Sequence, residues 1–269
     1  MTLQTNIAPV NLLALVVAAM ALSLAATARA QPRQVLVPSG SFHSVMPEVE
    51  GEPIRVASFY LDVTAVTNEQ YEVFTAKHEQ WQRGEVPAVF ASSDYLKHWA
   101  ASGPDYEVIG KNRPVTHVSW FAANAYCQSV GGRLPTLNEW EYSAQLMDFD
   151  SQSSVSQFAA RLMSWYSSVD TKNSAAVGST GIENRLGVKD QFGLIMEWVQ
   201  DFKPPVADDL SLDCGTVGRM QQWGNAYSYA ASIRYITRMS YSPTTATATM
   251  GFRCAYNMEQ EPETATIAQ

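Results

Sequence analysis

Hydrophobic and polar positions predict two strands and a helix near the beginning of the chain. Residues 35–42 alternate weakly and are interrupted by a proline and a glycine, as in a short edge strand followed by a turn. Residues 54–63 are rich in β-branched and aromatic side chains, which predicts a second strand. Thr67 then begins a helix, because apolar side chains recur after it at helical spacing. Residues 79–112 follow no period, and we expect them to form a long surface excursion.

Two further helices are predicted in the middle of the chain, each with its own N-terminal signal. Ser119 is a candidate N-cap for a helix over about 120–130, which two glycines end. Thr136 is the second N-cap, and Glu139 three residues later completes a capping box. From Val199 onward the pattern indicates strands and turns without a long helix. Few helices and much irregular chain predict a loop-rich α+β domain.

The first thirty residues have the features of a signal peptide. An apolar run over 12–26 is too short and too small in side-chain volume for a membrane span of about 20 residues. Ala28-Arg29-Ala30 follows it as a small-x-small cleavage pattern, so we expect residues 1–30 to be removed before Gln31. The alternative is an uncleaved N-terminal anchor. Cleavage would leave no stable membrane span and a periplasmic or secreted protein.

The net charge bears on which partners the chain can bind, and the cysteine count bears on which disulfides it can form. The formal net charge is −8 and there is no Lys/Arg block, so we expect no nucleic-acid partner, because phosphate contacts need clustered cations. Residues 257–269 carry three glutamates and no aromatic side chain, which predicts a disordered acidic tail. Three cysteines in an exported chain cannot all pair with one another, so one stays free or bonds elsewhere.

Five segments, in this order and spacing, resemble the formylglycine-generating enzyme (sulfatase-modifying factor) family. They are Val66-Thr-Asn68, Arg113-Pro-Val-Thr-His-Val-Ser-Trp-Phe-Ala-Ala-Asn-Ala-Tyr-Cys127, Gly131-Gly-Arg-Leu-Pro-Thr-Leu-Asn-Glu-Trp-Glu-Tyr142, Gly193-Leu-Ile-Met-Glu-Trp198 and Met250-Gly-Phe-Arg-Cys254. The resemblance implies one irregular, C-type-lectin-like α+β domain over 31–256, with few regular elements. Within the family, Trp165-Tyr-Ser-Ser168, Cys214-Gly215 and the 229–238 stretch resemble exported bacterial members associated with nitrite reductase or copper-chaperone genes.

The same comparison shows that two metal sites of the family have lost ligands. Aerobic members hold Cu(I) between two cysteines and oxidise the cysteine of a Cys-x-Pro-x-Arg peptide; Asn225 and Ala230 stand at those two places, so we expect no copper at the family site. In the family's calcium loop Leu194 replaces an asparagine ligand. Glu197 remains a candidate calcium ligand, and the alternative is a buried carboxylate satisfied by backbone N–H groups.

The resemblance also assigns the cysteines. Cys127 and Cys254 fall at positions that resemble a disulfide pair, which would close a loop of well over a hundred residues and contribute about 4–5 kcal/mol in the chain-entropy model. The alternative is two buried free thiols. Cys214 is left as a candidate catalytic, redox or metal-binding thiol, although no cation near it in sequence would lower its pKa; a structural cysteine is the alternative.

One aromatic and cationic stretch resembles the segment that lines the family's substrate groove. Its side chains can hold a peptide by stacking and by bidentate hydrogen bonds, or they can form a core with arginine–carboxylate ties. The six candidate groove residues are Trp223, Tyr227, Tyr229, Arg234, Tyr235 and Arg238. The histidines at 43, 78, 98 and 117 show no metal-ligand spacing, and we expect His117 to be a packed strand residue.

These features lead to a ranked set of functions. The leading hypothesis is an accessory or maturation factor of the bacterial envelope that binds a protein or peptide partner through the groove. The alternative is a non-copper periplasmic oxidase that acts on a peptide or a siderophore-type substrate. A third reading, a lectin-like module that presents loops to ligands, rests on the fold alone.

Overall fold

The computed structural model describes residues 33–44, 52–148, 156–158, 160–162, 164, 175–201 and 241–258. The predicted signal peptide and all but the first two residues of the predicted tail lie outside these ranges. The chain divides after Arg33, and the elements described below belong to the part from Gln34 onward. They are β1 (Gln34–Val37), β2 (Gly40–Phe42), β3 (Ile54–Val56), β4 (Phe59–Asp62), α2 (Asn68–Lys77), η1 (Glu79–Trp81), α3 (Tyr106–Ile109), α4 (Trp120–Ser129), α5 (Leu137–Ala144), β5 (Met196–Glu197), β6 (Met250–Gly251) and β7 (Ala255–Asn257).

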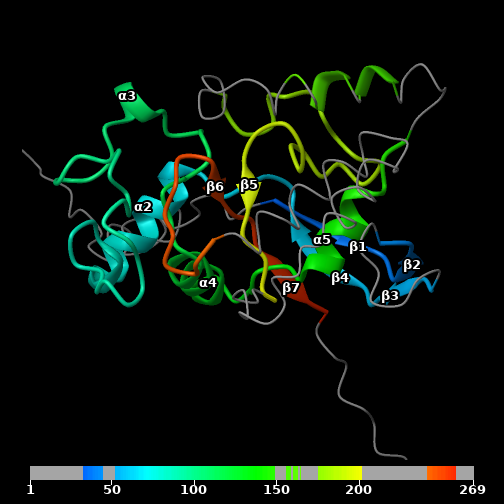
Figure 1. The fold of residues 1–269 in the computed structure, drawn as a ribbon, viewed down its shortest axis with the longest axis horizontal. Helices are drawn as coiled ribbons and strands as arrows, with labels where there is room; N and C mark the ends of the chain where they lie inside the picture. Colours follow the sequence, from blue (N-terminus) through cyan, green and yellow to red (C-terminus); the bar gives the residue numbers. More distant parts are fainter. Residues whose placement is uncertain are drawn as a thin grey trace, which may run out of the picture. The chain divides into compact units, whose positions relative to one another are not determined.

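The strands form three small sheets, one of which joins the two ends of this part of the chain (Figure 1). β4 lies between β1 and β7, and both pairings are antiparallel. β2 pairs with β3 in an antiparallel ladder, and β5 pairs with β6 in a parallel one. The single strand expected over 54–63 is therefore two strands, β3 and β4, which belong to different sheets. β4 thus pairs with one strand from each end of the described part of the chain.

The three main helices begin at the residues that the sequence indicates. Thr67 and Thr136 both form complete capping boxes, with Gln70 and Glu139 at the third helical position. The Ser119 hydroxyl accepts the Ala122 N–H at the start of α4. Each cap satisfies a backbone donor that the first helical turn cannot pair. The predicted helix starts are confirmed.

The largest cluster of buried residues is aromatic and joins α2, α4 and the last described segment. Tyr71 of α2 stacks on Tyr126 of α4 with ring centroids 5.7 Å apart. Phe252 meets both rings edge-on, at 6.1 Å from Tyr71 and 5.3 Å from Tyr126. Edge-to-face and offset-stacked contacts are the favoured aromatic arrangements. This cluster positions the segment before β7 against both helices.

Residues 79–112 are not a simple surface excursion, and that expectation is wrong. Tyr95, Leu96 and Trp99 are buried in the aromatic cluster, and Tyr95 and Tyr71 share a hydroxyl hydrogen bond of 2.7 Å. The buried residues are held in short turns rather than in a periodic element. The sequence offered no period because no long helix or strand carries these side chains.

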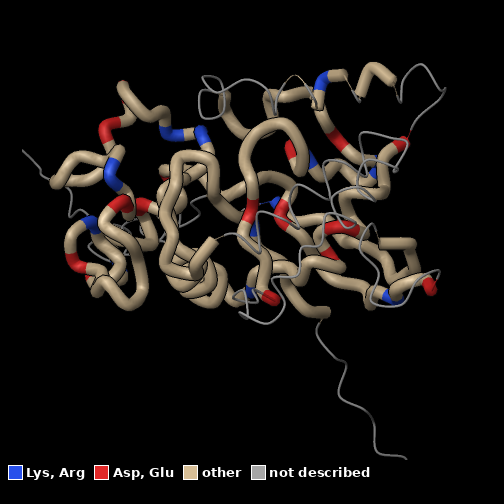
Figure 2. Tube along the Cα trace, in the orientation of Figure 1, with Lys and Arg blue, Asp and Glu red and all other residues tan. Residues whose placement is uncertain are grey.

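Along the described residues, acidic and basic side chains are interspersed rather than gathered in one block (Figure 2). None of the helices in this part of the chain has the length and apolar character needed to cross a bilayer.

Candidate functional site

The arginine of the Met250–Cys254 motif is fully buried and forms a cross-brace. Arg253 pairs with Glu197, with Nη2 2.9 Å from Oε1 and Nε 2.9 Å from Oε2, and both side chains are 0% exposed. Nη1 donates to the carbonyls of Asp62 and Val63, each at 3.1 Å, and Nη2 donates to the carbonyl of Lys189 at 2.9 Å. A guanidinium has five N–H donors, and all five are used.

The carboxylate at the centre of this network also fixes helix α5. Trp140 of α5 donates its indole N–H to Oε2 of Glu197 at 2.7 Å. Glu197 is thus a buried carboxylate, as in our structural alternative, but its donors are side chains rather than the backbone N–H groups that we expected. Because Arg253 engages both of its oxygens, Glu197 is a poor calcium ligand in this arrangement. Leu194, at the lost asparagine position, is buried among apolar side chains.

The predicted disulfide between Cys127 and Cys254 is present, and it lies beside a second buried carboxyl group. Both cysteines are 0% exposed, and the bond ties α4 to the residue before β7. Asp62 accepts the Cys254 N–H at 3.0 Å. Burial raises the pKa of Asp62 to about 7, against the lowering effects of the Cys254 hydrogen bond, Arg253 and Tyr256. The disulfide, Asp62 and Arg253 therefore form one continuous buried region.

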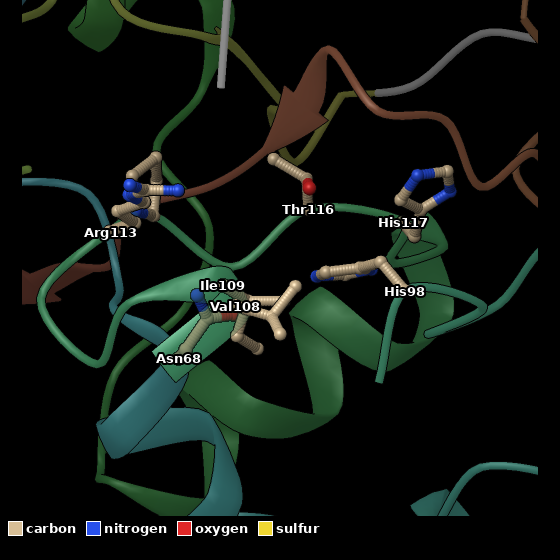
Figure 3. Close-up of a pocket in the computed structure, with 8 residues that line it drawn as sticks. Asn68, His98, Val108, Ile109, Arg113, Thr116 and His117 are labelled. Carbon is tan, nitrogen blue, oxygen red and sulfur yellow. The ribbon is translucent and has the colours of Figure 1, made fainter. Parts of the chain in front are cut away.

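A cavity of about 200 Å³ opens beside this frame, where α2 begins and α3 ends. Figure 3 shows Arg113 on one side, His98 and His117 on the other, Thr116 between them, and α3 residues across the space. The segment 113–117, which leads into α4, supplies much of the lining. The lining residues are Asn68, His98, Val108, Ile109, Arg113, Pro114, Thr116 and His117.

The two histidines of this cavity are adjacent although they are far apart in sequence. Their ring centroids lie 4.9 Å apart. Burial lowers the pKa of His98 to about 4, assisted by His117 and Arg83, and burial also lowers the pKa of His117. Both imidazoles are therefore neutral at pH 7. The Nδ1 atoms of both rings are buried and have no hydrogen-bond partner among the described residues.

His117 occupies a bend and not a strand, which corrects our expectation. Its φ of 54° lies in the left-handed region, which histidine adopts less readily than glycine. The backbone is held there by two hydrogen bonds: its N–H donates to the Thr247 carbonyl at 2.8 Å, and its carbonyl accepts the Leu96 N–H at 2.9 Å. These bonds attach the motif before α4 to two distant segments. They also bring His117 to His98, a neighbour that spacing rules for metal ligands could not reveal.

Asn68 and Arg113 complete the cavity in different ways. Asn68 is buried and structural: its amide donates to the Gly110 carbonyl at 3.0 Å, and its carbonyl oxygen accepts the Trp99 indole N–H at 3.3 Å. Arg113 is half-buried, and its guanidinium has no ion-pair or hydrogen-bond partner among the described residues. The cavity therefore holds one permanent cation and no lining carboxylate.

Several candidates from the sequence lie outside the described residues. These are Cys214, the positions Asn225 and Ala230, and the six groove residues of the 223–238 stretch. Trp198, at the end of the Gly193–Trp198 motif, is described: it is buried and donates its indole N–H to the Val118 carbonyl at 2.9 Å. In the described part, no group of three or more His, Cys, Asp or Glu side chains could hold a metal ion.

A family model, curated proteins and a solved structure all match most of this chain. The sulfatase-modifying factor enzyme 1-like domain matches residues 21–258. The chain is 26% identical over 303 residues to the formylglycine-generating enzyme of Streptomyces coelicolor, covering 86% of this chain and 91% of that protein. It is 26% identical over 270 residues to the inactive C-alpha-formylglycine-generating enzyme 2 of Mus musculus, with 83% and 85% covered. Among solved structures, CarF aligns with a TM-score of 0.53 at 17% identity, over 85% of this chain and 99% of CarF, which supports the fold alone.

Proposed function

Because the chain belongs to the sulfatase-modifying factor enzyme 1-like family, we propose that it is an exported accessory or maturation factor of the cell envelope. It binds a protein or peptide partner and does not carry out the copper-dependent oxidation of a peptide cysteine. The scaffold of the family serves here to present a binding surface. The observation that supports this proposal is that two of the three cysteines form a disulfide.

Two of the three cysteines are committed to a structural bond. Cys127 and Cys254 form a fully buried disulfide, so neither offers a thiolate to a metal. Cys214 is then the single remaining cysteine of the chain. A site that grips Cu(I) between two thiolates of one chain needs two free cysteines. One chain of this protein therefore cannot build that site, wherever Cys214 lies.

The buried network of Arg253, Glu197 and Trp140 is nevertheless complete, which favours a protein that still folds and has a function. Arg253 keeps all five of its donors satisfied, and Glu197 also holds Trp140 of α5. Loss of a buried ion-pair partner is strongly destabilising, so this network is a structural requirement of the fold that is separate from any oxidation. The similarity to an inactive formylglycine-generating enzyme 2 is in keeping with a family scaffold that works without the oxidation.

The described residues on either side of positions 202–240 bond to the same residue, Trp120. Trp120, the first residue of α4, donates its indole N–H to the Val199 carbonyl at 2.8 Å and its backbone N–H to the Pro243 carbonyl at 2.9 Å. The segments before and after residues 202–240 are thus both attached to Trp120. Phe121 next to it contacts Phe90, which is 41% exposed. An exposed aromatic of this kind is typical of a protein-binding surface.

The first experiment tests the absence of copper-dependent oxidation. The purified, disulfide-bonded protein is incubated with Cu(I), oxygen and a Cys-x-Pro-x-Arg peptide, and the peptide is followed by mass spectrometry. The Streptomyces coelicolor enzyme is the positive control. We expect no aldehyde product from this chain, and turnover of the peptide would overturn the proposal.

The second experiment tests partner binding and separates it from local chemistry. The protein is cross-linked in its native compartment, and the cross-linked products of three forms are compared: wild type, Cys214→Ser, and Arg234→Ala with Arg238→Ala. We expect one discrete partner that is retained by Cys214→Ser and lost in the double arginine variant. A function abolished by Cys214→Ser alone would instead favour the non-copper oxidase.

A further inference from the structure

We propose that the cavity between Arg113 and His98 binds an aliphatic carboxylate, carried either by a small free acid or by the last residue of a peptide. This site is distinct from the 223–238 groove and goes beyond the proposed function. The inference rests on two features of the cavity, which are its charge and its shape.

The charge of the cavity favours a single anion. None of its lining residues is Asp or Glu, and Arg113 is always protonated. The other described arginines with buried or half-buried side chains near carboxylates are paired, as in Arg133–Glu139 at 2.6 Å and Arg253–Glu197 at 2.9 Å. Arg113 has no such partner within the described residues. A guanidinium in a partly enclosed space is a ready bidentate donor to a carboxylate.

The shape of the cavity favours a short apolar tail on that anion. Val108, Ile109 and Pro114 supply the apolar part of the lining, and Val108, which is 68% exposed, lies at its open side. Figure 3 shows Val108 and Ile109 facing the space between Arg113 and His98. The volume of about 200 Å³ is below the roughly 300–1,000 Å³ of sites for drug-sized ligands, and a dry cavity of about 150 Å³ is enough for benzene. A branched chain of a few carbon atoms therefore fits, whereas a multiply charged phosphate ester would face one cation and an apolar wall.

The far wall of the cavity adds no charge. His117 is only 7% exposed, and the Nδ1 atoms of His117 and His98 are buried, so they do not face the cavity. Among the described lining residues, Arg113 is therefore the charged group that an anion would meet. A metal ion is not favoured, because the described residues provide no third ligand and the charges near the two histidines are mostly positive: Arg113, Arg83 and Lys97, against the carboxylate of Asp94.

The test uses 4-methylpentanoate as the probe and isothermal titration as the measurement, on the full mature protein at pH 7. We expect saturable binding of the acid and none of the neutral 4-methylpentanamide. Arg113→Gln should weaken binding by about 10- to 100-fold, the value expected for a charged hydrogen bond. Lys111→Gln is the matched control, because it removes the same charge two residues away from an exposed side chain that does not line the cavity.

Two further variants keep the result interpretable. Arg113→Lys retains the charge but loses the planar fork, so its affinity should lie between those of wild type and Arg113→Gln. Thr116→Val removes a lining hydroxyl without changing charge and should weaken binding less than Arg113→Gln does. Circular dichroism confirms that each variant is folded. The proposal is overturned if the acid does not bind, if the amide binds equally well, or if Arg113→Gln and Lys111→Gln behave alike.

The source of the carboxylate is distinguished with peptides. A short peptide that ends in leucine is titrated with a free C-terminus and with an amidated one. Tighter binding of the free-ended peptide than of 4-methylpentanoate would identify a peptide terminus, and the reverse order would identify a free acid. Either order supports the carboxylate site, whereas tighter binding of the amidated peptide contradicts it.

Discussion

Replacement of Glu197 by glutamine is expected to be among the most destabilising single changes to the buried frame. The substitution keeps the shape of the side chain but removes its charge and exchanges one acceptor oxygen for a donor NH₂ group. Arg253 donates to both carboxylate oxygens, so the new NH₂ group faces a guanidinium N–H whichever way the amide turns. With the amide nitrogen at the Oε2 position, the Trp140 indole also loses its acceptor.

The size of the effect follows from complete burial. Both side chains are 0% exposed, so water can neither solvate the uncompensated guanidinium nor screen it. Removal of one partner from a buried, hydrogen-bonded ion pair costs about 3–5 kcal/mol of unfolding free energy. Arg253→Met should cost at least as much, because it also leaves the carbonyls of Asp62, Val63 and Lys189 without their donor.

Urea unfolding at pH 7, followed by circular dichroism with the disulfide intact, measures these free energies. Glu197→Gln, Arg253→Met and the double variant form a cycle, whose coupling energy we expect to be about 2–3 kcal/mol. Glu183→Gln is the control: its 3.5 Å ion pair with Lys189 is largely exposed and should contribute less than about 1 kcal/mol. The reasoning is refuted if Glu197→Gln costs no more than Glu183→Gln, or if the cycle is additive.

Three more predictions concern the same buried region. Because the pKa of Asp62 is raised to about 7, the native state binds the Asp62 proton more tightly than the unfolded state, and the unfolding free energy falls as pH rises from about 4 to 7. Asp62→Asn should remove this pH dependence, which is worth roughly 4 kcal/mol between pH 4 and 8. The measurement is urea unfolding of wild type and variant over that pH range. Reduction of the Cys127–Cys254 bond, which spans 127 residues, should lower the unfolding free energy by about 5 kcal/mol, and a change below about 1 kcal/mol would contradict the chain-entropy account. Gly251→Ala would place a Cβ atom 2.5 Å from the Val115 carbonyl oxygen, so we expect a loss of about 3 kcal/mol and a lower thermal midpoint; an unchanged midpoint would show that the backbone can move there.

Local signals in the sequence were sufficient for the three longest helices, although not for α3 and η1, which lie in the stretch without a period. The caps at Thr67, Ser119 and Thr136 were predicted from residue types alone, because a capping side chain bonds to backbone atoms only three positions away. The disulfide was inferred from family positions rather than from local pattern, and its two cysteines are indeed bonded. Predictions of this kind need only short-range geometry or a family with known spacing.

Long-range packing explains what the sequence did not reveal. Tyr95 and Trp99 belong to a stretch without periodicity, yet they complete the aromatic cluster, because turns rather than a helix or strand direct them inward. His98 and His117 meet through backbone hydrogen bonds from His117 to Leu96 and Thr247. Neither bond involves a side chain, so no residue-type pattern records it. The cavity beside Arg113 is accordingly a product of tertiary structure.

The motifs that identify the family therefore indicate the fold of this chain and not its catalytic activity. Trp140, Glu197 and Arg253 each come from a different motif, and in the structure they contact one another in a single buried network. A network of this kind is required for the fold whether or not the chain oxidises a peptide. In this chain the structural disulfide leaves Cys214 as the one further cysteine. A match to the motifs is consequently compatible with the proposed absence of the oxidation, and thiol counting on the unfolded but unreduced protein should find one free cysteine per chain.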